Sequence, residues 1–198
     1  MRSSYIENDY ASIFSTTVVA NRCTKIVEVG ILDGYSLIAL AGGVRSMHMA
    51  YGVSGHIDAY DLFDEYNFKH GNIEEVRNKL EKDCLSEYVS VFQGDAYQVH
   101  DKYKNWEINL LHVDISNTGE TIRRIMELWH SKIEFGGFIL FEGGSVERDN
   151  IKWMLKYKKE SINPEIMTNK IIQENYDVKI YEPFPSLTVL KKKYLHDR

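Results

Sequence analysis

The segment Lys25–Ser36 constrains the fold of this chain more than any other; it reads Lys-Ile-Val-Glu-Val-Gly-Ile-Leu-Asp-Gly-Tyr-Ser. A short apolar run leads into Gly30, and a second glycine, Gly34, precedes Ser36 and an apolar segment at 37–41. A strand, a glycine turn and a helix are typical of the entry to a doubly wound α/β sheet, where ligands approach the backbone. An ordinary strand–helix turn has the same pattern. Glu28, a carboxylate in an otherwise apolar strand, favours the ligand-binding interpretation.

Alternating apolar segments continue this pattern along the chain. Strands are predicted at 25–29, 56–61, 88–92, 108–114 and 138–142, and helices at 5–21, 35–50, 73–84, 98–103, 117–133 and 148–159. The last two strands, 176–181 and 186–191, have only a short connection between them and must be antiparallel, because a parallel crossover needs about a dozen residues. The chain is therefore predicted to form one α/β domain over 1–198, with a leading helix in 1–22 and the core in 23–198.

Composition excludes several classes of protein. With 198 residues, 43% of them hydrophobic, the chain suits a single domain with a substantial core. A net charge of −5 argues against general affinity for nucleic acid or an anionic membrane, and the basic run at 191–193 is interpreted as the solvated end of the last strand. The two cysteines, Cys23 and Cys84, are too few for a disulfide framework. Without a signal-peptide pattern or a membrane-length apolar segment, a cytoplasmic protein is expected.

Each of the first five predicted strands has an acidic residue at or near its carboxyl end: Glu28, Asp61, Asp95, Asp114 and Glu142. In an open parallel sheet these strand ends line one crevice. Gathered carboxylates repel one another, and burial makes their ionisation more costly. Such a rim is suited to hydrogen-bonding hydroxyl groups and amines, or to facing a cation.

The acidic rim discriminates between two common cofactors. A dinucleotide places its pyrophosphate over the first glycine turn, which favours backbone N–H groups with few anions nearby. The turn here also lacks the third glycine of Gly-x-Gly-x-x-Gly. S-adenosylmethionine has no phosphate; it has a sulfonium, an ammonium group, a ribose diol and an adenine, which fit acidic partners better.

These features resemble the class I S-adenosylmethionine-dependent methyltransferases, particularly the branch that contains small-molecule and sugar O-methyltransferases. The resemblance spans about 25–190, and the matching residues are 28–36, Asp61, Gly94-Asp95-Ala96, Val113-Asp114 and Gly136-Gly137. It implies a Rossmann-like, doubly wound, seven-stranded sheet with the order 3-2-1-4-5-7-6 and an antiparallel last strand.

The resemblance also implies how the donor is bound. Gly30 and Gly34 let the methionine part of the donor lie against the backbone, and Glu28 supports the turn or the donor's ammonium group. Ser36 offers its hydroxyl or amide to the donor's carboxylate. Asp61 accepts both ribose hydroxyls.

On the same resemblance, Asp95 and Ala96 flank the adenine, and Asp114 lies beside the sulfonium and the acceptor. A hydroxyl acceptor must lose its proton during methyl transfer. Asp114 is the first candidate for the catalytic base.

Two positions depart from the family pattern. Metal-dependent members hold a divalent cation between the end of strand four and an Asp-Asn pair after strand five, whereas strand five here ends Glu142-Gly143-Gly144. A metal is therefore not predicted, although Asp114 and Glu142 would be the ligands if Mg²⁺ bound with several waters. Related members often have a histidine where this chain has Asn117. Asn117 is interpreted as a helix cap, with a substrate contact as the alternative.

The remaining candidates are weaker. His70 lies on the predicted loop after the second strand, close to where an acceptor would bind. Glu147, Arg148 and Asp149 are interpreted as a charged helix start, with contact to a polar acceptor as the alternative.

The sequence thus predicts an enzyme that transfers a methyl group from S-adenosylmethionine to a hydroxyl of a small polar molecule or saccharide. One alternative is a non-catalytic scaffold that binds the donor, and another is a nicotinamide-dependent oxidoreductase. No nucleic-acid or membrane partner is expected, and a homodimer is compatible with the pattern.

Overall fold

The computed structural model describes residues 4–68 and 70–194. The strand order is β3-β2-β1-β4-β5-β7-β6, which confirms the predicted Rossmann-like α/β topology. The chain divides into two compact units, Met1–Gln98 (unit 1) and Val99–Arg198 (unit 2), and each is described by itself.

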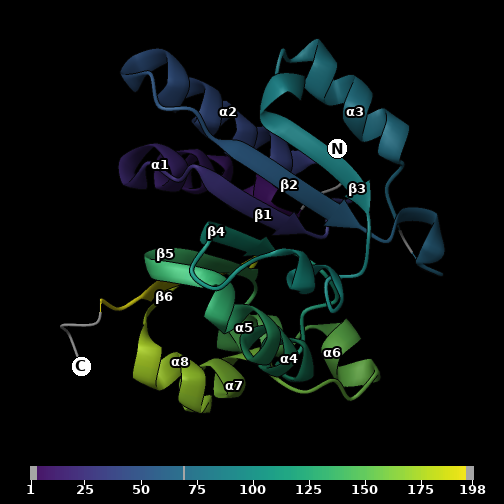
Figure 1. The fold of residues 1–198 in the computed structure, drawn as a ribbon. Coiled ribbons are helices and arrows are strands. Elements are labelled where there is room, and N and C mark those ends of the chain that lie inside the picture. The colour runs from purple at the N-terminus through teal and green to yellow at the C-terminus, as the bar shows by residue number, and fades with distance from the viewer. Residues whose placement is uncertain (1–3, 69, 195–198) are drawn as a thin grey trace. The chain divides into compact units, whose positions relative to one another are not determined.

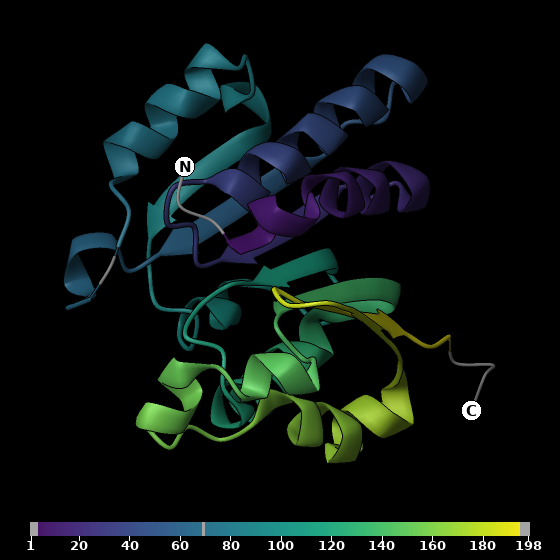
Figure 2. The same ribbon diagram turned by 180° about the vertical axis from the view of Figure 1, so that it is seen from behind.

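Unit 1 contains three parallel strands in the order β3-β2-β1, which are β1 (Lys25–Val29), β2 (His56–Asp61) and β3 (Val89–Gln93). Its helices are α1 (Ala11–Asn21), α2 (Tyr35–Tyr51) and α3 (Ile73–Lys82), and α1 and α2 lie side by side (Figures 1 and 2). Short 3-10 helices occupy Ser4–Asn8, Phe63–Glu65 and Ser86–Tyr88. Because the strands are parallel, their carboxyl ends share one edge of the sheet.

Two predicted helices of unit 1 differ from the structure at their ends. The leading helix is interrupted, because Asp9 adopts a positive φ of 49° and separates the Ser4–Asn8 turn from α1. Residues 1–3, which belong to the predicted leading segment at 1–22, lie outside the described residues. Helix α3 begins at the predicted place, where the side chain of Asn72 caps it, but it ends at Lys82. Cys84, the last residue of the predicted helix at 73–84, lies beyond α3 at a φ of 55° and is exposed.

Unit 2 contains four strands in the order β4-β5-β7-β6. Their bounds are β4 (Ile108–Val113), β5 (Ile133–Glu142), β6 (Tyr176–Tyr181) and β7 (Leu187–Lys192). Strands β4 and β5 are parallel, and β7 is antiparallel to both β5 and β6. The short connection predicted the antiparallel pairing of β6 and β7.

The helices of unit 2 lie on one side of its strands (Figures 1 and 2). They are α4 (Gly119–Trp129), α5 (Val146–Asp149), α6 (Lys152–Lys156), α7 (Ile162–Thr168) and α8 (Lys170–Asn175), and 3-10 helices occupy Val99–Lys102 and His130–Lys132. The buried side of α4 carries Ile122, Ile125, Met126 and Trp129, at the predicted helical spacing. These side chains form part of the core of unit 2.

Several predictions for unit 2 were wrong in detail. Strand β5 begins at Ile133 and not at 138, so Gly136 and Gly137 lie inside it, and the positive φ of Gly136 (80°) is accommodated within the strand. The predicted helix at 148–159 is split into α5 and α6, since Ile151 is extended. Helices α7 and α8 were not predicted. Lys192 is buried and donates to the carbonyls of His130 and Ile133, both at 2.8 Å, so the basic run is not simply solvated.

None of the helices within the described residues is both long and apolar enough to cross a membrane.

Candidate functional site

The predicted glycine turn joins β1 to α2. Gly30 and Gly34 both adopt positive φ values, 90° and 83°, which side chains with a Cβ rarely tolerate. The amide of Gly30 donates to the carbonyl of Tyr60 at 2.8 Å, and the amide of Gly34 donates to the carbonyl of Ile31 at 2.9 Å. The turn is therefore a tight, internally bonded loop at the carboxyl end of β1.

Glu28 holds the beginning of α2 against β1. Its carboxylate is fully buried, and Oε1 accepts a hydrogen bond from the Ser36 hydroxyl at 2.5 Å. A buried carboxylate is costly unless it is hydrogen-bonded, so this bond offsets part of the cost of its burial. This bond ties the start of α2 to β1, and both roles predicted for Glu28, support of the turn and contact with the donor's ammonium group, stay predictions. The Ser36 hydroxyl already donates to Glu28. The predicted contact of Ser36 with the donor's carboxylate therefore stays a prediction, and it would be made by the backbone amide.

Asp61 fastens the glycine turn from the neighbouring strand. Its Oδ2 accepts from the amides of Ile31 (2.6 Å) and Leu32 (3.0 Å), and its Oδ1 accepts from the amide of Phe63 at 2.8 Å. A carboxylate has about four acceptor sites, and three are used here. The predicted bidentate contact with a ribose is untested, and it requires at least one of these backbone bonds to be exchanged for a ribose hydroxyl.

The loop after β3 is also organised by a carboxylate. Asp95 Oδ1 accepts from the amide of Tyr97 at 2.9 Å, and Ala96 beside it is buried. The amide of Gly94 donates to the carbonyl of Asp61 at 2.9 Å, which places this loop next to the end of β2. Within unit 1, the structure thus brings together the strand ends that carry Glu28, Asp61 and Asp95.

A cavity of about 360 Å³ lies at this edge of unit 1. The loop after β2, the beginning of α3 and the end of β3 line it, and Phe63, Asp64, His70 and Gln93 are among the residues. His70 is exposed, and its Nδ1 lies 2.9 Å from the carbonyl oxygen of Gly71. The structure therefore places His70 at this cavity. Its predicted part in binding an acceptor stays a prediction.

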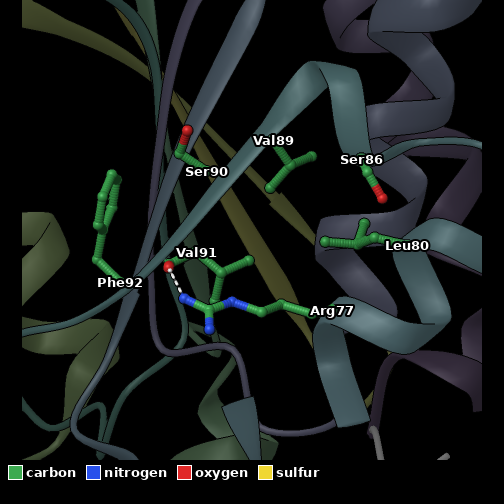
Figure 3. A pocket seen from close by; sticks show the side chains of 7 residues that line it. All are labelled: Arg77, Leu80, Ser86, Val89, Ser90, Val91 and Phe92. Atoms are coloured by element: carbon green, nitrogen blue, oxygen red, sulfur yellow. Dashed lines mark hydrogen bonds between the residues drawn. The ribbon is translucent and has the colours of Figure 1, made fainter. Parts of the chain in front are cut away.

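A second cavity, of about 320 Å³, lies between α3 and β3. Val89 and Val91 point toward the helix, whereas Ser90 and Phe92 point to the other side of the strand (Figure 3). The guanidinium of Arg77 spans the gap and donates to the carbonyl of Val91 at 3.1 Å. This cavity contains none of the predicted site residues, and its lining is that of a helix packed on an edge strand.

In unit 2, Asp114 and Glu142 stand at the carboxyl ends of the parallel strands β4 and β5. Asp114 is the first residue after β4 and is half-buried. Parallel strands end at the same edge, so the two acids share that edge as predicted.

Asn117 does not cap the following helix, so that interpretation was wrong. The cap of α4 is Thr118, whose hydroxyl accepts from the amide of Thr121. Asn117 is fully buried and instead joins two strand ends, since its Nδ2 donates to the carbonyls of Val113 and Glu142, both at 3.1 Å. Its Oδ1 is buried and has no hydrogen-bond partner among the described residues.

The carboxylate of Glu142 is held by Arg148. Arg148 Nε lies 2.9 Å from Oε1, and Nη2 lies 3.0 Å from Oε2, in a bidentate pair whose partners are both buried. Arg148 was predicted to belong to a charged helix start, and it lies in α5, but its pairing with Glu142 was not predicted. No pattern in the sequence indicates this pair, because Glu142 and Arg148 are six residues apart and joined through a Gly-Gly turn.

The residues of unit 2 fit a divalent cation poorly. Mg²⁺ binds through open carboxylate oxygens and waters, but both oxygens of Glu142 are already occupied by a guanidinium. No cluster of three or more His, Cys, Asp and Glu side chains is arranged to hold a metal anywhere in residues 4–68 and 70–194.

Comparison with known proteins agrees with this architecture. A family model described as a methyltransferase domain matches residues 27–142, more than half of the chain, and the chain belongs to this family. No curated protein matches it in sequence.

Solved structures share the fold at low sequence identity. A methyltransferase from Geobacter sulfurreducens is 11% identical with a TM-score of 0.67, over 94% of this chain and 79% of that one. The methyltransferase PaMTH1 from Podospora anserina, solved with S-adenosylhomocysteine (SAH), is 17% identical with a TM-score of 0.66, over 98% and 80%. The O-methyltransferase TomG from Streptomyces achromogenes, solved with S-adenosylmethionine, is 12% identical with a TM-score of 0.65, over 96% and 86%.

Proposed function

We propose that this methyltransferase transfers a methyl group from S-adenosylmethionine to a hydroxyl oxygen of a small polar molecule or saccharide. The observation that carries the proposal is the glycine turn of unit 1, which acidic side chains surround and fasten. Glu28 and Asp61 both bond directly to this turn or to the helix that follows it. The neighbouring structures with S-adenosylmethionine or SAH bound support the same donor.

The donor occupies the edge of unit 1 formed by the ends of β1, β2 and β3. Gly30 and Gly34 leave room beside the backbone for its methionine part. Asp61 accepts both ribose hydroxyls after at least one backbone amide has released its hydrogen bond to the carboxylate. Asp95 and Ala96 flank the adenine, as the family resemblance implies.

When bound, the donor supplies a sulfonium-activated methyl group, so the protein mainly has to align the acceptor and receive its proton. Asp114 serves as the general base. Its position directly after β4 and its half-buried state allow it to face an acceptor while remaining fixed by the strand. Glu142, at the end of the neighbouring strand, is paired with Arg148 and is a poorer candidate for the base.

A surface of α6 and the residues just after it supports a polar, saccharide-like acceptor. Trp153 and Tyr157 are exposed, and their ring centres are 6.4 Å apart. Lys159 Nζ lies 5.8 Å from the centre of the Trp153 ring, and Lys156 Nζ lies 5.0 Å from that of Tyr157. Exposed rings suit the C–H faces of sugars, and the amines suit hydroxyl or anionic groups. In both views α6 lies at the end of unit 2 toward which β4 points (Figures 1 and 2).

The Gly143-Gly144 turn and Asn117, which stand where related enzymes have an Asp-Asn pair and a histidine, favour one rival, a scaffold that binds the donor without turnover. Incubation with methyl-labelled donor and a panel of acceptors separates the two. Label transfer that is lost in Asp114→Asn supports the enzyme, whereas binding of SAH without transfer to any acceptor supports the scaffold. We further propose that the chain acts as a single cytoplasmic methyltransferase domain over 1–198 without nucleic-acid or membrane partners, and a homodimer is compatible with this.

A further inference from the structure

A buried charged pair of unit 2 lies where metal-dependent relatives of the predicted branch would bind a cation. Both oxygens of Glu142 accept from the guanidinium of Arg148, at 2.9 Å to Nε and 3.0 Å to Nη2. Each residue is 7% exposed, so water competes little for these bonds. Bidentate guanidinium–carboxylate pairs combine charge with fixed geometry, and arginine stays protonated at any physiological pH.

The backbone around this pair leaves space for the side chain of Arg148. The amide of Arg148 donates to the Ser145 hydroxyl at 3.1 Å, and the Thr188 hydroxyl donates to the carbonyl of Gly143 at 2.8 Å. A Cβ added at Gly143 would lie 3.2 Å from Cγ of Arg148 and 2.9 Å from Cδ1 of Ile162. The Gly-Gly turn, which replaces the Asp-Asn pair of metal-dependent relatives, therefore makes room for the side chain of Arg148.

Asp149 fixes the same short helix from its other side. Its Oδ1 accepts from the amide of Ile162 at 2.6 Å, and its Oδ2 accepts from the amide of Asn163 at 2.9 Å. Both oxygens of this second buried acid are thereby used by backbone. Arg148 is held in place by its neighbours in sequence as well as by Glu142.

Asn117 occupies the space on the strand side. Its amide nitrogen bridges the carbonyls of Val113 and Glu142, so it ties the ends of β4 and β5 together next to the pair. An amide side chain used in this way cannot also turn its oxygen freely toward a cation. The oxygen of Asn117 and Nη1 of Arg148 are buried and have no partner among the residues that the structure describes.

From these contacts we infer that Arg148 is the resident cation of this site and takes the place of a divalent metal. Binding of Mg²⁺ or Mn²⁺ through Glu142 would require a buried bidentate pair to separate and would leave the guanidinium beside the metal. The enzyme therefore works without a divalent cation, and removal of the acceptor's proton depends on Asp114 without a Lewis acid. Arg148 is a positioning residue that fixes Glu142 and the turn after β5. Only the catalytic consequence, methyl transfer without a divalent cation, rests on the proposed function.

The test is a titration of the full chain with Mn²⁺, followed by electron paramagnetic resonance of the free ion. The wild-type chain is expected to bind no Mn²⁺ saturably up to about 1 mM, a range in which weak carboxylate sites fill. Saturable binding by the wild type that is lost in Glu142→Gln would overturn the inference. Methyl transfer by the wild type should be the same with and without EDTA.

Variants of the pair provide the matched control. Arg148→Met leaves Glu142 buried and unpaired, so its unfolding midpoint should fall by several degrees, and the double variant Arg148→Met/Glu142→Gln should recover most of that loss. In the folded fraction of Arg148→Met, any Mn²⁺ binding that appears should vanish in the double variant. If Arg148→Met is as stable as the wild type, Arg148 does not hold Glu142 and the inference fails.

The failure of the inference and the failure of the proposed function give different results. Transfer that EDTA abolishes and Mg²⁺ restores would refute the role of Arg148 and leave the methyltransferase intact. A chain that binds neither SAH nor Mn²⁺ would refute the proposed function, while the Mn²⁺ titration would still agree with a paired Glu142.

Discussion

Replacement of Asp61 by alanine is the most informative single change in unit 1, because this carboxylate is bonded to the glycine turn and is also predicted to bind the donor. The substitution removes three backbone-to-carboxylate hydrogen bonds, at 2.6, 3.0 and 2.8 Å. A hydrogen bond to a charged group contributes about 1.5–3 kcal/mol. Asp61 is half-buried, so water replaces part of this contribution, and we expect a loss of about 2–4 kcal/mol in the free energy of unfolding.

Chemical denaturation of purified chains measures this loss. Asp58 lies on the same strand and provides a matched control, since its carboxylate makes a partly exposed ion pair with Lys25 at 2.6 Å. Such pairs contribute about 0–1 kcal/mol, so Asp58→Ala should be much milder. Equal losses for Asp58→Ala and Asp61→Ala would refute the view that Asp61 fastens the turn.

Calorimetric titration with SAH tests the second role of Asp61. At a temperature where Asp61→Ala is folded, the donor site should lose about 1–3 kcal/mol of binding free energy, which is the scale of a lost charged hydrogen bond. Unchanged affinity would contradict the ribose contact while leaving the structural role intact.

Other predictions concern separate parts of the chain. Gly30→Val should abolish SAH binding and cost about 1–3 kcal/mol of stability through strain at a φ of 90°. The control is Gly42→Ala on α2, where an added Cβ meets open space, and this change should leave SAH binding unchanged. Asp114→Asn should lower methyl transfer by about 10²–10⁴-fold with SAH affinity retained, and full turnover would remove it as the base. Burial raises the pKa of Tyr176 above its usual 10.0. The contribution of the neutral side chain to stability is therefore complete below about pH 10 and is lost as pH rises further. Above about pH 10, the free energy of unfolding of the wild type should fall by about 1.4 kcal/mol per pH unit more steeply than that of Tyr176→Phe. Trp153→Ala should raise KM for a saccharide acceptor and leave kcat unchanged, and equal KM values would exclude a stacking contact.

The fold was predictable because its signals are local and repeated. The apolar run before Gly30 and the stripe on α4 follow directly from the periods of strands and helices. The short connection between β6 and β7 could be only antiparallel. The errors occurred where a backbone break carries no hydrophobic signal, as at Asp9, which has a positive φ, and at Ile151, which is extended.

The positions of the candidate residues at the strand ends were predictable from the sequence, but the contacts of their side chains were not. Strand periodicity locates Asp61 at the end of β2, but nothing in the sequence shows that the amides of Ile31 and Leu32 would bond to it. The pair of Arg148 with Glu142 was missed for the same reason, because the connection depends on the path of a glycine turn. Patterns of residue type indicate chemistry, whereas the partner of each polar group is fixed by tertiary structure.

Calorimetric titration of the wild-type chain, with SAH and NAD in parallel, tests the donor assignment most directly. The proposed function predicts saturable binding of SAH at one site per chain, lost in Gly30→Val, and no binding of NAD. Saturable binding of NAD with no response to SAH would contradict it, because the turn at Gly30 would then hold a pyrophosphate and not a methyl donor.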